Sequence, residues 1–321
     1  MMMRKLIRLC MGALIALPCL AVGQTFPERA ITMVVPFPPG GSVDAVARRV
    51  AQGLSETLGQ SVVVENRSGA GGTIGATAVA NAPAGGYTLM FATSSALVVS
   101  PALYKNISYT ALGSFDPIIE VTRGPFILTV AKNLPVNNVG ELLAYAKQNP
   151  GKLNYASAGP GSAHHLAMEG FKQVSGMEVF HIPYKGGAPA WPALLAGEVQ
   201  MLFDSMPGPL MHVGHVKPIA VTGPTRLDAL PEVPTFAEQG VAGVDNVFLF
   251  GVVGPHGIPK DRIEKLHAAL LTTLERPEVV SALKAQGLDA SPGTPEQFGA
   301  LLAKEAPRFK ALVEHIGLTI D

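Results

Sequence analysis

Two turns that contain glycine and serine have the clearest chemical potential in this sequence. Gly40-Gly41-Ser42 and Gly159-Pro160-Gly161-Ser162 each lie between a short strand-like run and a helical pattern. The start of a helix presents unpaired N–H groups and the positive end of the helix dipole, and glycine lets a ligand approach the backbone closely. Two such helix starts across a cleft would suit a small molecule with carboxylates. The alternative interpretation is that both are ordinary capped helix starts.

Asp44 complicates the first turn. A carboxylate in the first turn of a helix satisfies the dipole itself and repels an adjacent anion, unless bound waters separate the two charges. Another glycine cluster, residues 69–75, approaches the dinucleotide-binding fingerprint, but its third glycine comes one place late. This cluster is therefore interpreted as a structural turn.

Candidate catalytic and metal-binding groups are few. No Gly-x-Ser-x-Gly motif is present, because Pro160 interrupts the frame around Ser162. The pairs His164-His165 and His212/His215 offer imidazoles, but adjacent histidines on a helix point in different directions, so no metal or other cofactor is predicted. Asp204 follows a buried run and is either an acid/base group or a polar cleft residue. The second interpretation is favoured because the sequence shows no partner for it.

The elements around the first turn alternate short strands with helices. The patterns predict a helix that begins near Ser42, with Ser42 placed to cap its first turn. They also predict a helix around residues 76–80 and strands at 31–35, 62–64 and 87–91. The run at 31–35 is apolar throughout, which is typical of a strand covered on both faces. This order predicts a parallel sheet with helices packed on it.

The same rhythm restarts in the second half, and 321 residues are enough for two domains. Further strands are expected at residues 126–130, 153–157, 179–182, 199–203 and 218–221. Further helices are expected at 139–148, 162–174, 262–274, 277–286 and 295–316. Joints rich in proline and glycine at 123–125 and 239–245 are the candidate domain crossings.

Much of the apolar character of the chain lies at its N-terminus. Three basic residues precede an apolar run at 9–22 that ends in small residues, which is the pattern of a secretory signal peptide cleaved after Gly23. The run has about 14 residues, fewer than the roughly 20 needed to span a bilayer. A lipid anchor at Cys19 is the alternative, but Pro18 stands where such signals have Gly or Ala.

Cleavage would change the charge and the cysteine content. Both cysteines, Cys10 and Cys19, lie in the segment expected to be removed, so no disulfide is predicted. Loss of Arg4, Lys5 and Arg8 leaves 21 basic against 24 acidic residues, a formal charge of −3. Nucleic acids and anionic membranes are not expected as partners of such a chain. Local geometry must therefore attract any bound anion.

Motifs along almost the whole chain after the signal peptide resemble the Bug family, the periplasmic solute-binding proteins of tripartite tricarboxylate transporters. They lie at residues 36–44, 62–72, 86–89, 101–104, 151–159 and 181–186. The resemblance implies an α/β, two-lobed periplasmic-binding-protein-like fold of type II, with two crossover strands and a ligand cleft. Its first lobe would be 24–126 with 247–321, and its second lobe 127–246.

The resemblance also implies ligand-binding residues on both sides of the cleft, some of them acting through water. In the first lobe these are Phe37, Gly40, Gly41, Ser42, Asp44, Thr93 and Ser94. In the second lobe they are Ser157, Ala158, Gly159, Gly161, Ser162, His165, Tyr184, Lys185 and Asp204. Two departures from the family pattern are expected to affect the pocket. His164 is expected to influence which ligand is bound. Leu249 stands where the family often has tryptophan and is expected to change the shape of the pocket wall.

The function expected from the turns and the resemblance is capture without catalysis. One lobe binds a small carboxylate, the hinge closes, and a monomeric protein delivers the ligand to the membrane permease subunits. The ligand could be a di- or tricarboxylate, an acidic amino acid or an aromatic acid. Two alternatives stay open: a sensor that docks to a signalling partner, and a periplasmic hydrolase or lyase that uses His165 or Asp204.

Overall fold

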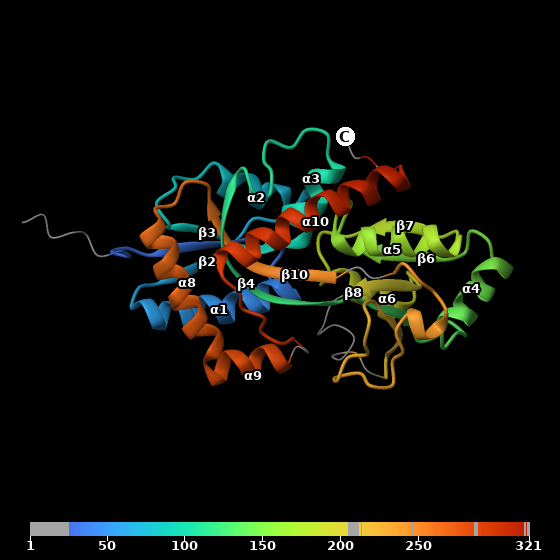
Figure 1. Ribbon diagram of the computed structural model, residues 1–321. Helices are drawn as coiled ribbons and strands as arrows, with labels where there is room; N and C mark the ends of the chain where they lie inside the picture. The colour runs from blue at the N-terminus through green and yellow to red at the C-terminus, as the bar shows by residue number, and fades with distance from the viewer. Residues whose placement is uncertain are drawn as a thin grey trace, which may run out of the picture.

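The computed structural model describes residues 26–204, 212, 214–244, 247–285, 288–317 and 319 (Figure 1). The predicted signal peptide, with Cys10, Cys19 and the expected cleavage after Gly23, lies outside these ranges. Within them, the helices are all too short or too polar to cross a bilayer.

Two five-stranded sheets form the centres of two lobes that lie beside each other (Figure 1). The first sheet has the order β2-β1-β3-β10-β4, with β1 Ile31–Val35, β2 Val62–Asn66, β3 Thr88–Thr93, β4 Phe115–Pro125 and β10 Val247–Pro255. The second has the order β7-β6-β8-β5-β9, with β5 Ile127–Ala131, β6 Asn154–Ser157, β7 Phe180–Pro183, β8 Met201–Asp204 and β9 Val216–Val221. The two sheets share one pattern. β5 and β10 each follow a crossing of the chain between the lobes, and each lies in the interior of its sheet.

Both sheets are mixed, which corrects the expectation of a parallel sheet. β1 pairs in parallel with β2 and β3, and β6 pairs in parallel with β7 and β8. β10 is antiparallel to β3 and β4, and β5 is antiparallel to β8 and β9. The antiparallel part of the first sheet was not predicted from the sequence. β4 ends in Arg123-Gly124-Pro125, which has the composition of a joint, and no strand was expected at β10.

Helices cover the sheets and position the loops of the cleft. In the first lobe they are α1 Ser42–Leu58, α2 Thr73–Ala80, α3 Ser100–Leu103, α8 Lys260–Glu275, α9 Pro277–Ala285 and α10 Pro295–Ile316, with the short helices η1 Ala70–Gly72 and η2 Ser95–Val99. In the second lobe they are α4 Val139–Gln148, α5 Ala163–Ser175, α6 Ala190–Ala196 and η3 Ala237–Gln239. Helix α10 packs on β4 and also contacts α5, so it bridges the two lobes (Figure 1).

Local sequence accounts for α1, the helix that leads away from the cleft. Val46, Val50 and Leu54 recur every four residues, and all three are fully buried against the sheet and its neighbours. Gly59 ends the helix in the left-handed conformation, at a φ of 68°, which glycine adopts without strain. The N-terminal end of α1 is thereby held at the carboxyl end of β1.

The two lobes contact each other in this structure. The Ala163 N–H donates to Ser95 Oγ across the lobe boundary at 2.8 Å, and Ser100 Oγ donates to the Gly161 carbonyl at 3.2 Å. The Tyr104 hydroxyl donates to the Pro160 carbonyl at 2.9 Å. These bonds join η2 and α3 of the first lobe to the start of α5 in the second. The cleft is therefore closed.

Candidate ligand-binding site

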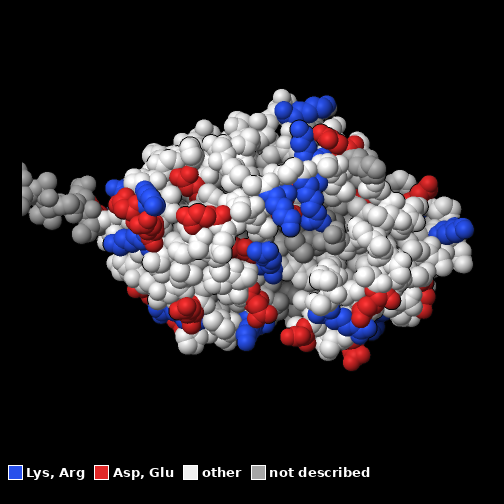
Figure 2. All heavy atoms as spheres, viewed as in Figure 1, with Lys and Arg blue, Asp and Glu red and all other residues white. Residues whose placement is uncertain are grey.

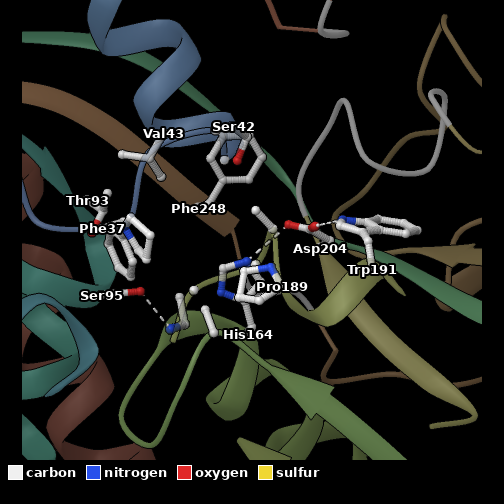
Figure 3. A pocket seen from close by; sticks show the side chains of 18 of the residues that line it. Phe37, Ser42, Val43, Thr93, Ser95, His164, Pro189, Trp191, Asp204 and Phe248 are labelled. Atoms are coloured by element: carbon white, nitrogen blue, oxygen red, sulfur yellow. Dashed lines mark hydrogen bonds and ion pairs between the residues drawn. The ribbon is translucent and has the colours of Figure 1, made fainter. Parts of the chain in front are cut away.

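A cavity of about 290 Å³ lies between the lobes (Figure 3). This volume is close to the lower limit of typical ligand pockets and suits one small molecule. The first lobe and the crossover segments supply Phe37, Pro38, Gly40, Gly41, Ser42, Val43, Thr93, Ser94, Ser95, Phe126, Phe248 and Phe250. The second lobe supplies Ala158, Ala163, His164, Gly186, Gly187, Ala188, Pro189, Trp191, Pro192, Leu195, Asp204 and His212.

Aromatic rings form much of the wall. The rings of Phe126 and Phe248 have centroids 5.8 Å apart, and those of Phe248 and Phe250 are 5.1 Å apart. Alternation along β10 directs these two residues to the cavity, whereas Leu249 is buried and does not line it. The expectation that Leu249 shapes the pocket wall is therefore wrong, and its two neighbours do so instead.

Asp44 is turned away from the cavity and compensated by the protein. Its Oδ2 accepts hydrogen bonds from Gly40 N–H at 3.0 Å and Arg48 Nε at 2.9 Å, and its Oδ1 accepts one from Asn66 Nδ2 at 2.8 Å. Burial raises the pKa of Asp44, but the bonds from Arg48, Gly40 and Asn66 outweigh it and hold the pKa below its ordinary value. The carboxylate is thus paired with Arg48 and does not line the cavity.

The start of α1 presents backbone donors to the cavity. The N-cap residue is Gly41, not Ser42 as expected, and the first N–H bonded within the helix is that of Ala45, which donates to the Gly41 carbonyl. In the described part of the chain, the N–H groups of Ser42 and Val43 have no protein acceptor, and both residues line the cavity. Together with the helix dipole they form a binding site for an anion.

The start of α5 is used differently. Ser162 is its N-cap and is fully buried, and Ser162 Oγ accepts the His165 N–H at 3.2 Å. The Ala163 N–H is occupied by Ser95 of the other lobe. The second turn therefore contributes mainly to the contact between the lobes. None of its residues 159–162 lines the main cavity, whereas the flanking Ala158 and Ala163 do.

The buried His165 belongs to a stack of rings behind this turn, together with the buried Tyr155 and the half-buried His181. The rings of His165 and His181 are parallel with centroids 4.1 Å apart, and Tyr155 stacks on His181 at 4.8 Å. His165 Nδ1 accepts the Gly161 N–H at 3.3 Å, and His181 Nε2 lies 2.6 Å from Ser157 Oγ. Burial lowers the pKa of His165 to about 4 and that of His181 to about 3. Both rings are neutral at physiological pH and hold the turn in place.

The structure gives Asp204 partners that the sequence did not indicate. Trp191 Nε1 donates to Asp204 Oδ2 at 2.7 Å, and His164 Nε2 lies 3.1 Å from Asp204 Oδ1 (Figure 3). The carboxylate stands at the end of β8 and is 4% exposed. His164 thus faces the cavity while His165 faces the ring stack, as the helical geometry predicted.

Three residues expected in the site line a neighbouring cavity of about 260 Å³. These residues are Gly159, Tyr184 and Lys185, and the loop 69–72 of the first lobe faces them. The two cavities share Phe37, Pro38, Ala158 and Gly186. The interlobe space therefore has an apolar main compartment and a smaller one that contains the lysine.

The structure thus brings together half of the residues expected in the site. Those that line the main cavity are Phe37, Gly40, Gly41, Ser42, Thr93, Ser94, Ala158 and Asp204. Those placed elsewhere are Asp44, Ser157, Gly159, Gly161, Ser162, His165, Tyr184 and Lys185. Among the described residues, no group of three or more His, Cys, Asp or Glu side chains is placed to hold a metal ion.

The aromatic wall was missed from the sequence, although some signals were present. Trp191 is the single tryptophan of the chain. Phe248 and Phe250 alternate in a run that ends in Gly251, which is a strand pattern. The charged side chains do not reveal the site. Figure 2 shows Lys and Arg as well as Asp and Glu on one face of the molecule. Because the described lining of the main cavity contains no lysine or arginine, donors within the cavity must attract an anion.

Two α/β lobes closed over a cavity with backbone donors are the architecture of a solute-binding protein of the periplasmic-binding-protein type. A family model described as "Tripartite tricarboxylate transporter family receptor" matches residues 46–318, and the chain belongs to this family. Protein BugT of Bordetella pertussis is 38% identical over 297 residues, which are 92% of this chain and 91% of BugT. The resemblance to the Bug family is thereby confirmed.

Solved structures agree with this assignment. The structure titled "R. palustris Rpa4515 with adipate" is 36% identical, with a TM-score of 0.87, and the match covers 92% of this chain and 99% of that one. MatC from Rhodopseudomonas palustris, with bound malate, is 31% identical, with a TM-score of 0.86, and the match covers 90% of this chain and 100% of that one. The two-lobed fold expected from the sequence is confirmed.

Proposed function

We propose that this protein captures a small carboxylate between its lobes and delivers it to the membrane subunits of a tripartite tricarboxylate-type transporter. One observation carries the proposal: Ser42 and Val43 line the interlobe cavity at the start of α1, and their N–H groups have no acceptor among the described residues. Backbone donors at a helix end bind a carboxylate without a cationic side chain. The relatives with bound adipate and malate support this ligand class.

Closure is the signal that the transporter would read. The ligand carboxylate binds first at the start of α1, and the second lobe then closes over it and forms the bonds to Ser95, Ser100 and Tyr104. The chain crosses between the sheets at Phe126 and again before β10. These crossings would act as the hinge between lobes 24–126 with 247–321 and 127–246.

The rest of the proposal concerns the setting in which the protein works. The chain would be exported by residues 1–23, cleaved near Gly23, and act as a periplasmic monomer that recognises permease subunits. The ligand would be bound without being converted, because His165 is held in the ring stack and Asp204 accepts a hydrogen bond from Trp191. A sensor role would use the same closure with another partner.

Calorimetric titration of the mature protein, freed of copurified ligand, tests this proposal. The panel should contain mono-, di- and tricarboxylates, amino acids and aromatic acids, with matched neutral amides as controls. We expect saturable binding of at least one acid and none of its amide. Mass spectrometry of the ligand after prolonged incubation should recover it unchanged. Absence of binding across the panel, or turnover of the ligand, would refute the proposal.

A further inference from the structure

We infer that the main cavity selects a carboxylate that carries a single negative charge, and that Asp204 excludes a ligand with a second carboxylate. The favoured ligand has an apolar body and, where it has a second polar group, that group is a nitrogen-based cation or N–H donor. This inference rests on the proposed function, because it specifies the ligand of the same site.

The first support is the charge around the cavity. Among its described lining residues there is no lysine or arginine, and Asp204 is the one carboxylate. Lys185 lines the neighbouring cavity instead. Asp44 and its partner Arg48 both lie outside the lining. A second ligand carboxylate would thus meet the like charge of Asp204 and no lysine or arginine of the described wall.

The second support is that the Asp204 carboxylate is fixed beside the ligand space. Trp191 and His164 hold its two oxygens at 2.7 Å and 3.1 Å. Gly187 borders this carboxylate, since a Cβ added there would lie 3.6 Å from Oδ2 and 3.7 Å from Oδ1. A charge that cannot turn away interacts strongly with a ligand in a cavity of low polarity.

The third support is the position of Asp204 relative to the donors of α1. A Cβ added to Gly41 would lie 3.8 Å from the Cβ of Ala188, and Ala188 follows Gly187 in the chain. The loop that contacts the start of α1 therefore also borders Asp204. One small ligand can reach both sites, with its carboxylate at the donors and its other end near Asp204.

The fourth support is the remaining wall. Phe126, Phe248, Phe250, Trp191 and Leu195 offer apolar surface to the body of a ligand. A second carboxylate against this surface would lose its hydration without gaining donors, which is costly. An alkyl chain or a ring gains from the same surface. The walls and Asp204 therefore favour the same ligand class.

A series of acids with one six-carbon chain tests the inference. Hexanoate has one carboxylate, adipate has two, and 6-aminohexanoate has a carboxylate and an ammonium group. In calorimetric titrations we expect wild type to bind hexanoate or 6-aminohexanoate at least about tenfold more tightly than adipate. Benzoate and terephthalate form a second pair of the same kind, with the same expected preference for the single charge.

The variant Asp204→Asn should relax this selectivity. Asparagine can still accept a hydrogen bond from the Trp191 N–H. The ratio of the affinities for two ligands is measured within one variant, so a change in this ratio reports the charge of the side chain and not a change in folding. The ratio of hexanoate to adipate affinity should fall by about tenfold, and 6-aminohexanoate should lose affinity relative to hexanoate. The matched control is Asp116→Asn, because Asp116 bonds Gly257 and Ile258 away from the cavity. Its ratios should equal those of wild type.

The outcomes separate this inference from the proposed function. Equal or tighter binding of adipate by wild type would overturn the inference and leave carboxylate capture intact. Unchanged ratios in Asp204→Asn would also overturn it. Failure of every acid to bind would refute the proposed function itself.

Discussion

The hydroxyl oxygen of Ser95 accepts a 2.8 Å hydrogen bond from the N–H of Ala163, and this bond joins the two lobes. It occupies a donor at the start of α5, whereas the corresponding donors at the start of α1 face the cavity. Two similar turns therefore have different tasks: the first is available to a ligand, and the second holds the lobes together. The stability of the closed form should consequently depend on residues around α5 that do not touch the ligand.

Removal of a bond between the lobes should weaken ligand binding from outside the cavity. Ser100 is buried, and its Oγ lies 3.2 Å from both the Gly161 and Gly71 carbonyls, so it links the lobes. Ser100→Ala should raise the Kd about two- to tenfold, because a buried hydrogen bond contributes about 0.5–1.5 kcal/mol to the closed state. Ser55→Ala is the control, since Ser55 bonds within the first lobe. Calorimetry should show a changed Kd for Ser100→Ala only.

A side chain placed between the lobes should hinder closure. Gly71 has a φ of 64°, and an added Cβ would lie 2.7 Å from Ser100 Oγ and 3.1 Å from the Gly161 and Pro160 carbonyls. Gly71→Ala should therefore weaken binding at least about tenfold and leave a larger radius of gyration in the presence of ligand. Gly59→Ala has a similar backbone strain, but nothing lies within 4 Å of its Cβ. An unaltered Kd in Gly71→Ala would contradict the closed arrangement.

The stacked pair of the buried His165 and the half-buried His181 should make the protein less stable in mild acid. The pKa of His165 is about 4 and that of His181 about 3 in the folded state, against 6.5 for an ordinary histidine. Between these values the unfolded chain binds more protons, so the free energy of unfolding falls as the pH drops below 6.5. We expect a loss on the order of 2 kcal/mol from each of the two histidines between pH 7 and pH 4.5.

Urea unfolding at these two pH values measures that loss. His181→Gln should show a smaller difference between the two pH values than wild type, because one of the two stacked imidazoles with a lowered pKa is gone. His215→Gln changes an exposed ring and should behave as wild type. An identical pH dependence in His181→Gln and wild type would show that the ring stack does not cause the effect.

The sequence predicted those features that depend on local patterns. The buried run of β1, the apolar spacing of Val46, Val50 and Leu54 in α1, and the turns that precede α1 and α5 were all recognisable. The capping residue of α1 was not, because Ser42 and Gly41 both suit an N-cap. The bounds of α4 and α10 agree with the expected 139–148 and 295–316.

The site depended on contacts that join distant parts of the chain. Asp204 obtains its partners from α5 and α6, and no spacing in the sequence indicates that His164 and Trp191 converge on it. The N–H donors at the start of α1 and at the start of α5 come after similar turns in the sequence. They differ in the structure because Ser95 accepts the hydrogen bond of the α5 donor. The phenylalanines of the wall come from β10 and from the crossing at Phe126. The sequence pattern had predicted Phe126 as part of a strand.

The central claim, that the start of α1 binds the ligand carboxylate, is tested most directly by a charge at Ser42. Ser42→Asp places a negative charge at these donors, whereas Ser42→Asn has a similar size and no charge. A first-turn aspartate also favours the helix, so folding should be preserved. With the acid that wild type binds most tightly, calorimetry should give a Kd at least about tenfold higher for Ser42→Asp and within about threefold of wild type for Ser42→Asn. Equal affinities for wild type and Ser42→Asp would contradict the account.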